Sequence, residues 1–125
     1  MTAFRSKFEQ RFAADLKTNG VPVVYEQTFV SYTVPASDHR YTPDFRVNET
    51  YIETKGVLKI ADRKKMLLVK EQHPDKKFIL VFQNWNNKIC KGSKTTYKMW
   101  AEKNGFECYN EVVPASRLKE LAKNF

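Results

Sequence analysis

Two motifs determine how the rest of this chain is interpreted. The first is Tyr41-Thr42-Pro43-Asp44-Phe45, and the second is Glu53-Thr54-Lys55, which begins eight residues after Phe45. The second motif lies in a run with strand composition, and successive side chains of a strand point to opposite faces. Glu53 and Lys55 are therefore expected on one face and Thr54 on the other. Asp44 comes within reach of Glu53 if the two segments pair as a hairpin.

An aspartate beside a Glu-x-Lys motif is the minimal set of side chains for metal-assisted cleavage of a phosphodiester. Two carboxylates suit Mg²⁺, which prefers oxygen ligands and keeps several waters. A bound metal lowers the pKa of one of these waters and neutralises charge that develops on the phosphate. Lys55 would orient the nucleophile as a point charge. Two simpler interpretations remain open: the paired charges could lie on an exposed strand face, and Asp44 could be a turn residue.

The composition limits the classes of protein to which the chain can belong. Its 125 residues predict one domain, residues 1–125. The 22 Lys and Arg residues against 14 Asp and Glu give a net charge of +8, which favours a polyanionic partner such as nucleic acid. No apolar run approaches the roughly 20 residues of a membrane span, and the N-terminus does not resemble a signal peptide. We therefore expect a cytoplasmic protein with no membrane partner.

The cysteines also indicate a cytoplasmic protein. Cys90 and Cys108 lack the spacing of a zinc site or of a disulfide framework. Two reduced thiols are therefore expected, as is usual for a cytoplasmic protein.

Periodicity and breaker residues predict an α/β fold in which helices flank a mixed β-sheet. The almost continuous apolar run at 77–82 indicates a central strand covered on both faces. Asp62 is expected to cap the second helix, and residues 35–38 are expected to break the first strand-rich run. The expected helices are 4–17, 63–72, a short one capped by Thr95 or Thr96 and ending at Asn104-Gly105, and 115–123; the expected strands are 21–34, 45–47, 51–55, 77–82 and 107–113.

Several further motifs occur in the same chain. In order they are Phe4-Arg5-Ser6 with Glu9, Val34-Pro35-Ala36-Ser37, the two motifs above continued to Gly56, Asp62-Arg63-Lys64-Lys65, Glu71-Gln72-His73-Pro74 and Lys91-Gly92-Ser93. With these blocks in this order, the chain resembles the phage endonuclease I family from Phe4 to about Lys119. Members of that family are Holliday-junction-resolving enzymes with the restriction-endonuclease-like fold of the PD-(D/E)xK superfamily.

The resemblance implies a function and a set of site residues. It implies a Mg²⁺-dependent endonuclease, with Mn²⁺ as a substitute, that nicks and resolves four-way (Holliday) junctions and other branched DNA. The catalytic residues would be Glu9, Asp44, Glu53 and Lys55, and Glu9 would complete a metal site with Asp44 and Glu53. From the residues alone, Glu9 is an ordinary solvated charge on a helix.

The resemblance also implies how subunits assemble. Family members are homodimers that exchange segments, so the helix and strand of about residues 4–34 would cross to the partner. Glu9 would then serve the active site of the other subunit. Exchange of an identical element is a low-cost way to build a symmetric dimer.

Basic side chains near the motifs are candidates for contacts with DNA phosphates. Lys91 and Lys94 flank a Gly-Ser loop before a helix, where backbone N–H groups favour an anion. The basic cluster Arg63, Lys64 and Lys65 closely follows the catalytic strand. The alternative for this cluster is a solvated helix face, and the alternative for Lys91 and Lys94 is an exposed loop. Trp85 is expected to be an exposed or half-buried loop residue, or to stack on DNA. The full set of DNA-binding candidates is Arg5, Arg63, Lys64, Lys65, Lys91 and Lys94.

Two other functions remain open from the sequence. One is a nuclease of the same fold that acts on linear duplex DNA in restriction or repair. The other is a non-catalytic, basic DNA-binding module. Clustered carboxylates argue against the second, because an inert DNA binder gains nothing from negative charges beside a polyanion.

Overall fold

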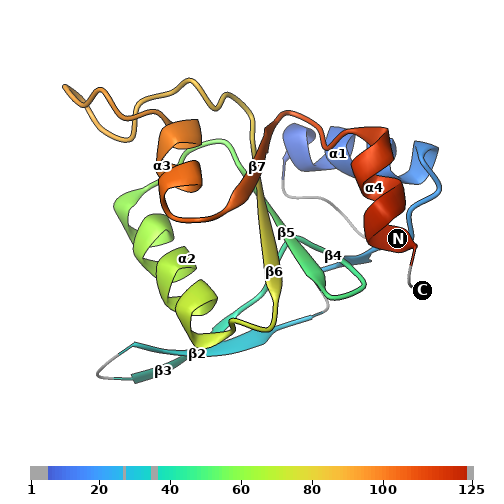
Figure 1. Ribbon diagram of the computed structural model, residues 1–125, viewed down its shortest axis with the longest axis horizontal. Helices are drawn as coiled ribbons and strands as arrows, with labels where there is room; N and C mark the ends of the chain where they lie inside the picture. Colours follow the sequence, from blue (N-terminus) through green and yellow to red (C-terminus); the bar gives the residue numbers. More distant parts are fainter. Residues whose placement is uncertain (1–5, 27, 35–36, 124–125) are drawn as a thin grey trace.

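The sheet that carries both motifs has five strands, in the order β1-β4-β5-β6-β7 (Figure 1). The computed structural model describes residues 6–26, 28–34 and 37–123. The strands β1 (Val24–Tyr25), β4 (Phe45–Val47) and β5 (Thr50–Lys55) pair antiparallel in succession. Two more strands, β6 (Lys77–Phe82) and β7 (Glu107–Asn110), continue the sheet in parallel. The predicted mixed α/β fold is confirmed.

Helices cover both faces of this sheet. On one face lie α2 (Ile60–Gln72), which connects β5 to β6, and α3 (Tyr97–Lys103), which connects β6 to β7 (Figure 1). On the other face lie α1 (Lys7–Thr18) and α4 (Ala115–Ala122). Parallel neighbours require long crossover connections, which is why a helix separates β5 from β6 and β6 from β7.

The strand β6 is the centre of the core, because its side chains are buried on both faces. Phe78, Leu80 and Phe82 pack in the core under α2 and α3. Ile79 and Val81 pack in the core under α1 and α4. A strand covered on both faces has no polar side, so its sequence is continuously apolar. The sequence predicted this strand with its observed bounds.

A second, two-stranded sheet extends along the end of α2 (Figure 1). In it β2 (Val30–Val34) pairs antiparallel with β3 (Ser37–Tyr41). The side-chain amide of Gln72, at the end of α2, binds β2 through both backbone groups of Thr33: its Oε1 accepts the N–H at 2.6 Å and its Nε2 donates to the carbonyl at 2.7 Å.

Two predictions about this region are wrong. Residues 21–34 do not form one strand, because β1 ends at Tyr25 and β2 begins at Val30 in a different sheet. Residues 37 and 38, expected in a break, belong to β3. β3 pairs with the preceding strand β2, and the propensities of single residues do not reveal this pairing. Pro35 and Ala36, also expected in the break, lie outside the described residues.

The helix α1 positions Glu9. The Ser6 hydroxyl caps the helix by accepting the Glu9 N–H at 3.0 Å. Phe8, Phe12 and Leu16, at four-residue steps on one face of the helix, are buried in the core. The helix begins at Lys7, and Phe4, its first expected residue, lies outside the described part of the chain.

The start of α2 differs from the prediction. The helix begins at Ile60 with Lys59 as its N-cap residue, so Asp62 is not the cap. Asp62 is instead the third residue of the helix, and its Oδ2 accepts the backbone N–H of Lys59 at 3.1 Å. This is the reciprocal half of a capping box, in which an acidic side chain one turn inside the helix reaches back to the cap. An aspartate suits either position, which is why the sequence did not separate them.

The remaining elements follow the prediction, with β4 at its predicted bounds and β5 beginning one residue earlier, at Thr50. Thr96 caps α3 by accepting the Met99 N–H at 3.1 Å, and Asn104 follows the last residue of that helix. The edge strand β7 and the helix α4 end three residues and one residue earlier than expected. Among the described residues, no helix is both long and apolar enough to cross a membrane.

Candidate active site

The two sequence motifs meet where β5 extends beyond the end of β4. Phe45, the first residue of β4, pairs with Ile52, so the last three residues of β5 have no partner in β4. The Asp44 side chain binds this unpaired part of β5: its Oδ2 accepts hydrogen bonds from the Thr54 N–H at 2.9 Å and the Thr54 hydroxyl at 2.8 Å. The predicted hairpin is confirmed, and the Asp44 carboxylate is fixed at its open end.

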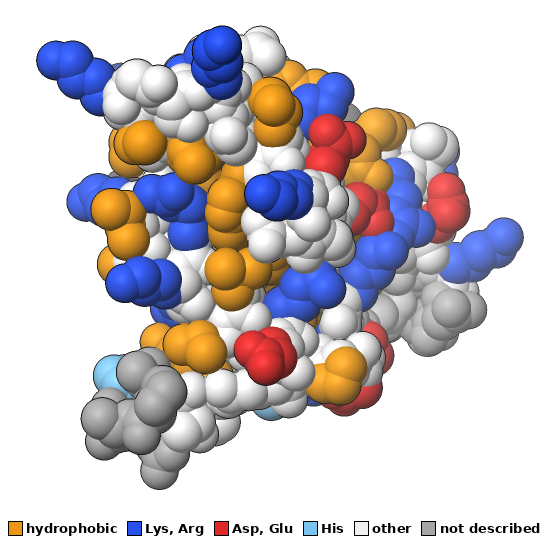
Figure 2. Space-filling view, turned by 60° about the vertical axis from the view of Figure 1, so that its left-hand side comes forward, with side chains coloured by type: hydrophobic (Ala, Val, Ile, Leu, Met, Phe, Trp, Pro, Cys, Tyr) orange, Lys and Arg blue, Asp and Glu red, His pale blue; other side chains and the backbone are white. Residues whose placement is uncertain are grey.

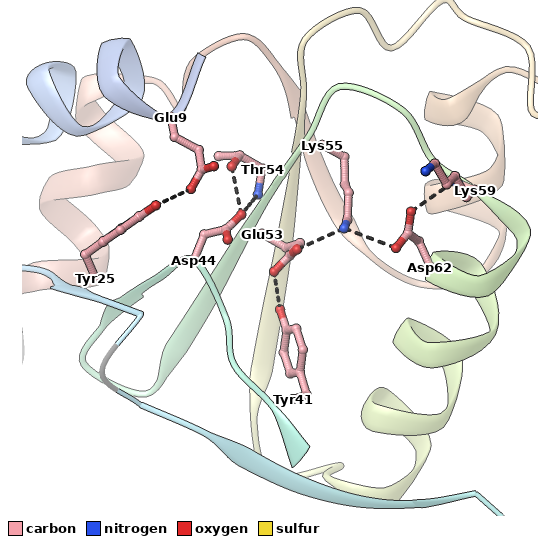
Figure 3. A network of polar contacts seen from close by, with 9 residues as sticks. All are labelled: Glu9, Tyr25, Tyr41, Asp44, Glu53, Thr54, Lys55, Lys59 and Asp62. Carbon is pink, nitrogen blue, oxygen red and sulfur yellow. Dashed lines mark hydrogen bonds and ion pairs between the residues drawn. The ribbon is translucent and has the colours of Figure 1, made fainter. Parts of the chain in front are cut away.

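The side chains of β5 divide the site between the two faces of the sheet. Tyr51 packs in the core under α2 and Ile52 in the core under α1. By alternation, Glu53 and Lys55 lie on the α2 side and Thr54 on the α1 side. The Lys55 Nζ is 3.1 Å from the Glu53 Oε2, which confirms the predicted common face (Figure 3).

Glu53 is a buried carboxylate with two partners. Its Oε1 accepts a 2.8 Å hydrogen bond from the Tyr41 hydroxyl, and its Oε2 pairs with Lys55. Burial raises the pKa of Glu53 to about 7, and the charge of Asp44 adds to the rise, while Lys55 and the Tyr41 hydrogen bond oppose it. Burial and the charge of Glu53 also raise the pKa of Tyr41 well above its ordinary value, so Tyr41 remains a donor.

The ammonium group of Lys55 lies between two carboxylates. Its Nζ is 3.1 Å from Glu53 Oε2 and 3.3 Å from Asp62 Oδ1 (Figure 3). Burial lowers the pKa of Lys55, but the charges of Glu53 and Asp62 outweigh that effect and raise it above its ordinary value. Lys55 is therefore a cation at neutral pH and cannot take up a proton there.

Glu53 and Asp62 form one group of carboxylates, around Lys55. A second group lies around Asp44. Glu9 is buried, and its Oε2 accepts a 2.7 Å hydrogen bond from the Tyr25 hydroxyl. Among the described residues, Glu9, Glu26 and Asp44 offer carboxylate oxygens that all lie within 4.8 Å of one another. Two of the three predicted metal ligands, Glu9 and Asp44, are thus brought together within one chain. The third, Glu53, lies outside this cluster.

Glu26 is the member of the cluster that the sequence did not indicate. It follows the last residue of β1, and its backbone N–H donates to the carbonyl of Asp44 at 3.2 Å. Its φ of 49° lies in the left-handed region, which few residues other than glycine adopt. Strained backbone of this kind clusters at functional sites. In the sequence, Glu26 is one charge at the end of a strand-rich run, and no neighbouring residue distinguishes it.

A cavity of about 570 Å³ opens beside both groups of carboxylates. Glu26 of the Glu9–Glu26–Asp44 cluster lines this cavity, and Glu53 lines it from the α2 side. Both groups of carboxylates therefore border the same cavity. Cations border the same space, which gives it the mixed charge required to hold both a metal ion and a phosphate. The residues that line it are Glu26, Arg40, Thr42, Glu53, Lys55, Asp62 and Lys65.

The basic residues that follow Asp62 have three different environments. Lys65 lines the cavity, and its Nζ lies 5.6 Å from the centre of the Tyr41 ring. Arg63 is half-buried, and its Nε has no hydrogen-bond partner among the described residues. Lys64 is exposed to solvent. Only part of this basic cluster is therefore a solvated helix face, and Lys65 is its member that borders the candidate active site.

The other DNA-binding candidates lie away from the cavity or outside the described chain. Lys91 and Lys94 are exposed in the loop before α3. Trp85, at the start of this loop, is half-buried, as predicted, with the Lys98 Nζ 4.4 Å from its ring centre. Arg5 lies outside the described residues. Figure 2 shows that Lys and Arg side chains are spread over much of the face on the α2 and α3 side, with acidic side chains among them.

The three buried or half-buried carboxylates of the cluster suit a hard metal ion. Asp44 and Glu9 are only 2% and 7% exposed, so water screens their mutual repulsion poorly. A bound cation would neutralise the repulsion between these like charges. An all-oxygen donor set is the kind that Mg²⁺ and similar cations prefer. The donors therefore fit a divalent metal ion.

Comparison with known proteins agrees with this geometry. A family model described as phage endonuclease I matches residues 1–125. The chain is 42% identical over 122 residues to "Endonuclease I" of Escherichia phage T7, which covers 97% of this chain and 82% of that protein. It is 43% identical over 122 residues to "Endodeoxyribonuclease 1" of Enterobacteria phage T3, with coverage of 97% and 80%.

These similarities extend over almost the whole chain. The chain belongs to the phage endonuclease I family. The resemblance inferred from the sequence motifs is therefore confirmed.

Proposed function

We propose that this chain is a Mg²⁺-dependent DNA endonuclease that nicks and resolves four-way junctions and other branched DNA. The observation that carries the proposal is the carboxylate cluster of Glu9, Glu26 and Asp44 beside Glu53 and Lys55, in a member of an endonuclease family. Burial of several acidic groups next to a polyanion is unfavourable unless the site performs chemistry that needs them.

The metal site is proposed to consist of Glu9, Asp44 and Glu53, with Glu26 as a fourth candidate ligand. Mg²⁺, or Mn²⁺ in its place, would lower the pKa of a bound water and neutralise charge on the phosphate. Tyr25 holds Glu9 and Thr54 holds Asp44, so these carboxylates are oriented before a metal ion arrives. Pre-oriented ligands lose less conformational freedom on binding.

The proposed reaction is hydrolysis of one phosphodiester in each nicked strand. A water oxygen forms the new bond to phosphorus, the bond from phosphorus to the 3′ oxygen breaks, and that oxygen leaves with a proton. The products carry a 5′-phosphate and a 3′-hydroxyl. Lys55 borders the cavity as a fixed cation, where it stabilises the negative charge that grows on the phosphate oxygens.

The proposed assembly is a homodimer of single endonuclease domains with the restriction-endonuclease-like fold, in which residues of about 4–34 are exchanged. In the described chain, α1 and β1 pack on their own sheet, and β1 pairs with β4. An exchanged dimer would make the same contacts between chains, with each chain crossing over near residue 34. Glu9 of each chain would then complete the site of its partner.

Selectivity for branched DNA would come from the geometry of this dimer. Two basic channels at a fixed angle suit the arms of a junction and not a straight duplex. Contacts with phosphates carry no sequence information, so such an enzyme would recognise shape. Lys65 is the strongest candidate for such a contact, since it lines the cavity, and Arg5, Arg63, Lys64, Lys91 and Lys94 are the others.

The direct test is cleavage of a synthetic four-way junction, with and without Mg²⁺, in competition with linear duplex of the same length. We expect Mg²⁺-dependent nicks near the branch point and little cleavage of the duplex. Equal cleavage of both substrates would favour a duplex-specific nuclease of the same fold. Binding without cleavage at any Mg²⁺ or Mn²⁺ concentration would favour a non-catalytic DNA-binding module.

The exchange is tested with a mixed dimer. Glu9→Ala and Asp44→Ala homodimers are each expected to be inactive, and the mixed dimer is made by co-expression with two affinity tags. If Glu9 serves the partner, both lesions fall in one site and the other site is intact, so the mixed dimer nicks one strand of a junction. If Glu9 serves its own chain, both sites lack a carboxylate, and a verified mixed dimer is inactive.

A further inference from the structure

We infer that Asp62 is a positioning residue that holds the Lys55 ammonium in the active site when a metal ion occupies Glu53. The inference rests on the proposed nuclease function and adds a residue that the Asp/Glu-x-Lys motif does not contain. It starts from the fact that Lys55 has two carboxylate partners, Glu53 Oε2 at 3.1 Å and Asp62 Oδ1 at 3.3 Å.

The two partners of Lys55 differ in what else they must bind. Glu53 Oε1 already accepts the Tyr41 hydroxyl, so Oε2 is the oxygen through which Glu53 would bind a metal ion. That is the same oxygen with which Lys55 pairs in the structure. A metal ion on Oε2 therefore competes with Lys55 for the same lone pairs and repels the ammonium charge.

A metal ion bound to Glu53 does not compete with Lys55 for Asp62. Asp62 comes from α2 rather than from the sheet, and it is not a member of the carboxylate cluster found among the described residues. Its second oxygen, Oδ2, accepts the Lys59 N–H at 3.1 Å, which fixes the carboxylate in the first turn of the helix (Figure 3). At that position the carboxylate interacts favourably with the positive end of the helix dipole.

Asp62 also lines the cavity that would receive the phosphate. A negative charge there opposes DNA binding, so a purely electrostatic view of binding gives no reason for it. Its contact with Lys55 supplies the reason. With Asp62 in place, the ammonium remains at the cavity wall after metal binding; without it, a flexible lysine side chain would move into solvent.

Substitutions at position 62 can separate this role from the capping of α2. Asp62→Gln keeps a side-chain acceptor suited to the third position of a capping box but removes the charge that holds Lys55. Asp62→Glu keeps both the acceptor and the charge. Asp75→Asn is a matched control for net charge, because Asp75 is 75% exposed and lies beyond the other end of α2.

The first measurement is single-turnover cleavage of a four-way junction at saturating Mg²⁺, with junction affinity measured separately in Ca²⁺. Asp62→Gln should slow cleavage by roughly tenfold or more, the scale seen for residues that orient catalytic groups. Its junction affinity should be unchanged or tighter and its melting temperature close to wild type. Asp62→Glu should restore most of the rate, and Asp75→Asn should match wild type.

The second measurement does not need activity. The ammonium resonance of Lys55, assigned by its loss in Lys55→Arg, is followed by ¹⁵N NMR as Mg²⁺ is added to the DNA-free protein. It should remain protected from solvent exchange in wild type and become unprotected in Asp62→Gln. A protected Lys55 in Mg²⁺-bound Asp62→Gln, or cleavage by that variant within twofold of wild type, would overturn the inference. Failure of the wild type to cut a junction would instead count against the proposed nuclease function.

Discussion

The Tyr41 hydroxyl donates a 2.8 Å hydrogen bond to Glu53 Oε1, and both side chains are buried. This bond stabilises the ionised form of Glu53 against the burial and the Asp44 charge that favour its neutral form. Because a metal ion binds the ionised form, Tyr41 and the metal ion act in the same direction on Glu53.

Tyr41→Phe should therefore move the pH dependence of the enzyme. Loss of the hydrogen bond raises the pKa of Glu53 further above 7, so the acidic limb of the cleavage profile at low Mg²⁺ should shift to higher pH. Higher Mg²⁺ should restore the rate at a given pH. The buried unpaired oxygen should also cost about 1–3 kcal/mol of stability. Tyr51→Phe, the same change at a buried tyrosine of the same core, is the control and should leave the pH profile unchanged.

Glu53 should also make the metal-free protein less stable as pH rises. Its pKa is about 7 in the folded chain against an ordinary value of 4.5, so between these limits the folded state binds more protons than the unfolded state. The contribution of Glu53 to stability is therefore lost as pH increases from about 4.5 to about 7. Denaturant unfolding in EDTA at pH 5 and pH 8 measures this loss, which should be smaller in Glu53→Gln. An equal loss in both proteins would contradict the raised pKa.

Metal binding should release protons for the same reason. Near pH 6.5 a sizeable share of Glu53 is protonated in the metal-free chain, and Mg²⁺ binding displaces that proton. Calorimetric titration in two buffers with different ionisation enthalpies counts the protons released. We expect a fractional release near pH 6.5 that falls towards zero by pH 9 and is reduced in Glu53→Gln. Release that is independent of pH would show that another group is responsible.

Glu107 on β7 should stabilise the opposite edge of the sheet through its charge. It accepts bonds from the Nε and the terminal NH2 group of Arg117 on α4, at 2.8 and 2.9 Å, and pairs with Lys77 on β6 at 2.9 Å. Burial opposes ionisation, but its hydrogen bonds with Arg117, Tyr109 and Lys77 lower the pKa of Glu107 to about 2.

The contribution of Glu107 should therefore be complete above about pH 4.5 and disappear as pH falls towards 2. Since the group is partly exposed, Glu107→Gln should cost only about 1 kcal/mol at pH 7. Denaturant unfolding should show this difference at pH 7 and a smaller one at pH 3. Glu120→Gln, which removes a largely exposed partner of Arg117, is the control and should have little effect.

Lys65 should contribute to the binding of every DNA shape. It lines the cavity beside the candidate active site, so Lys65→Ala should weaken binding to junction and duplex alike. If it contacts one phosphate, the slope of log K against log salt should become less steep by about one. Lys17→Ala, which removes an exposed charge from α1 on the other face of the sheet, is the control. A slope that does not change in Lys65→Ala would place this residue outside the DNA interface.

The sequence predicted the parts of the site that depend on local geometry. Glu53 and Lys55 share a face because strands alternate, and Asp44 reaches β5 because a short turn at Asn48 joins the two strands. The central strand at 77–82 was evident because burial on both faces leaves no polar positions.

The sequence did not predict the parts that depend on how helices and strands pack and pair. Glu26 reaches Asp44 because β1 pairs with β4, twenty residues along the chain, and its charge alone carries no sign of that pairing. The sequence predicts a helix cap at Asp62, because the contact that distinguishes this residue, with Lys55, forms only after α2 packs beside β5. Residues 37 and 38 of β3 are a different case, because they pair with the preceding strand β2 although Ser and Asp favour turns.

The central claim is that Asp44 belongs to a metal-dependent catalytic site, and Asp44→Asn tests it most directly. Asparagine retains a side-chain oxygen that can accept the Thr54 N–H, so the fold should be preserved while the charge is lost. Single-turnover cleavage of a four-way junction in Mg²⁺ is measured for wild type and variant, with binding measured in Ca²⁺. We expect the wild type to cut and the variant to be inactive while binding the junction at least as tightly. Cleavage by Asp44→Asn at a rate near wild type would contradict the account.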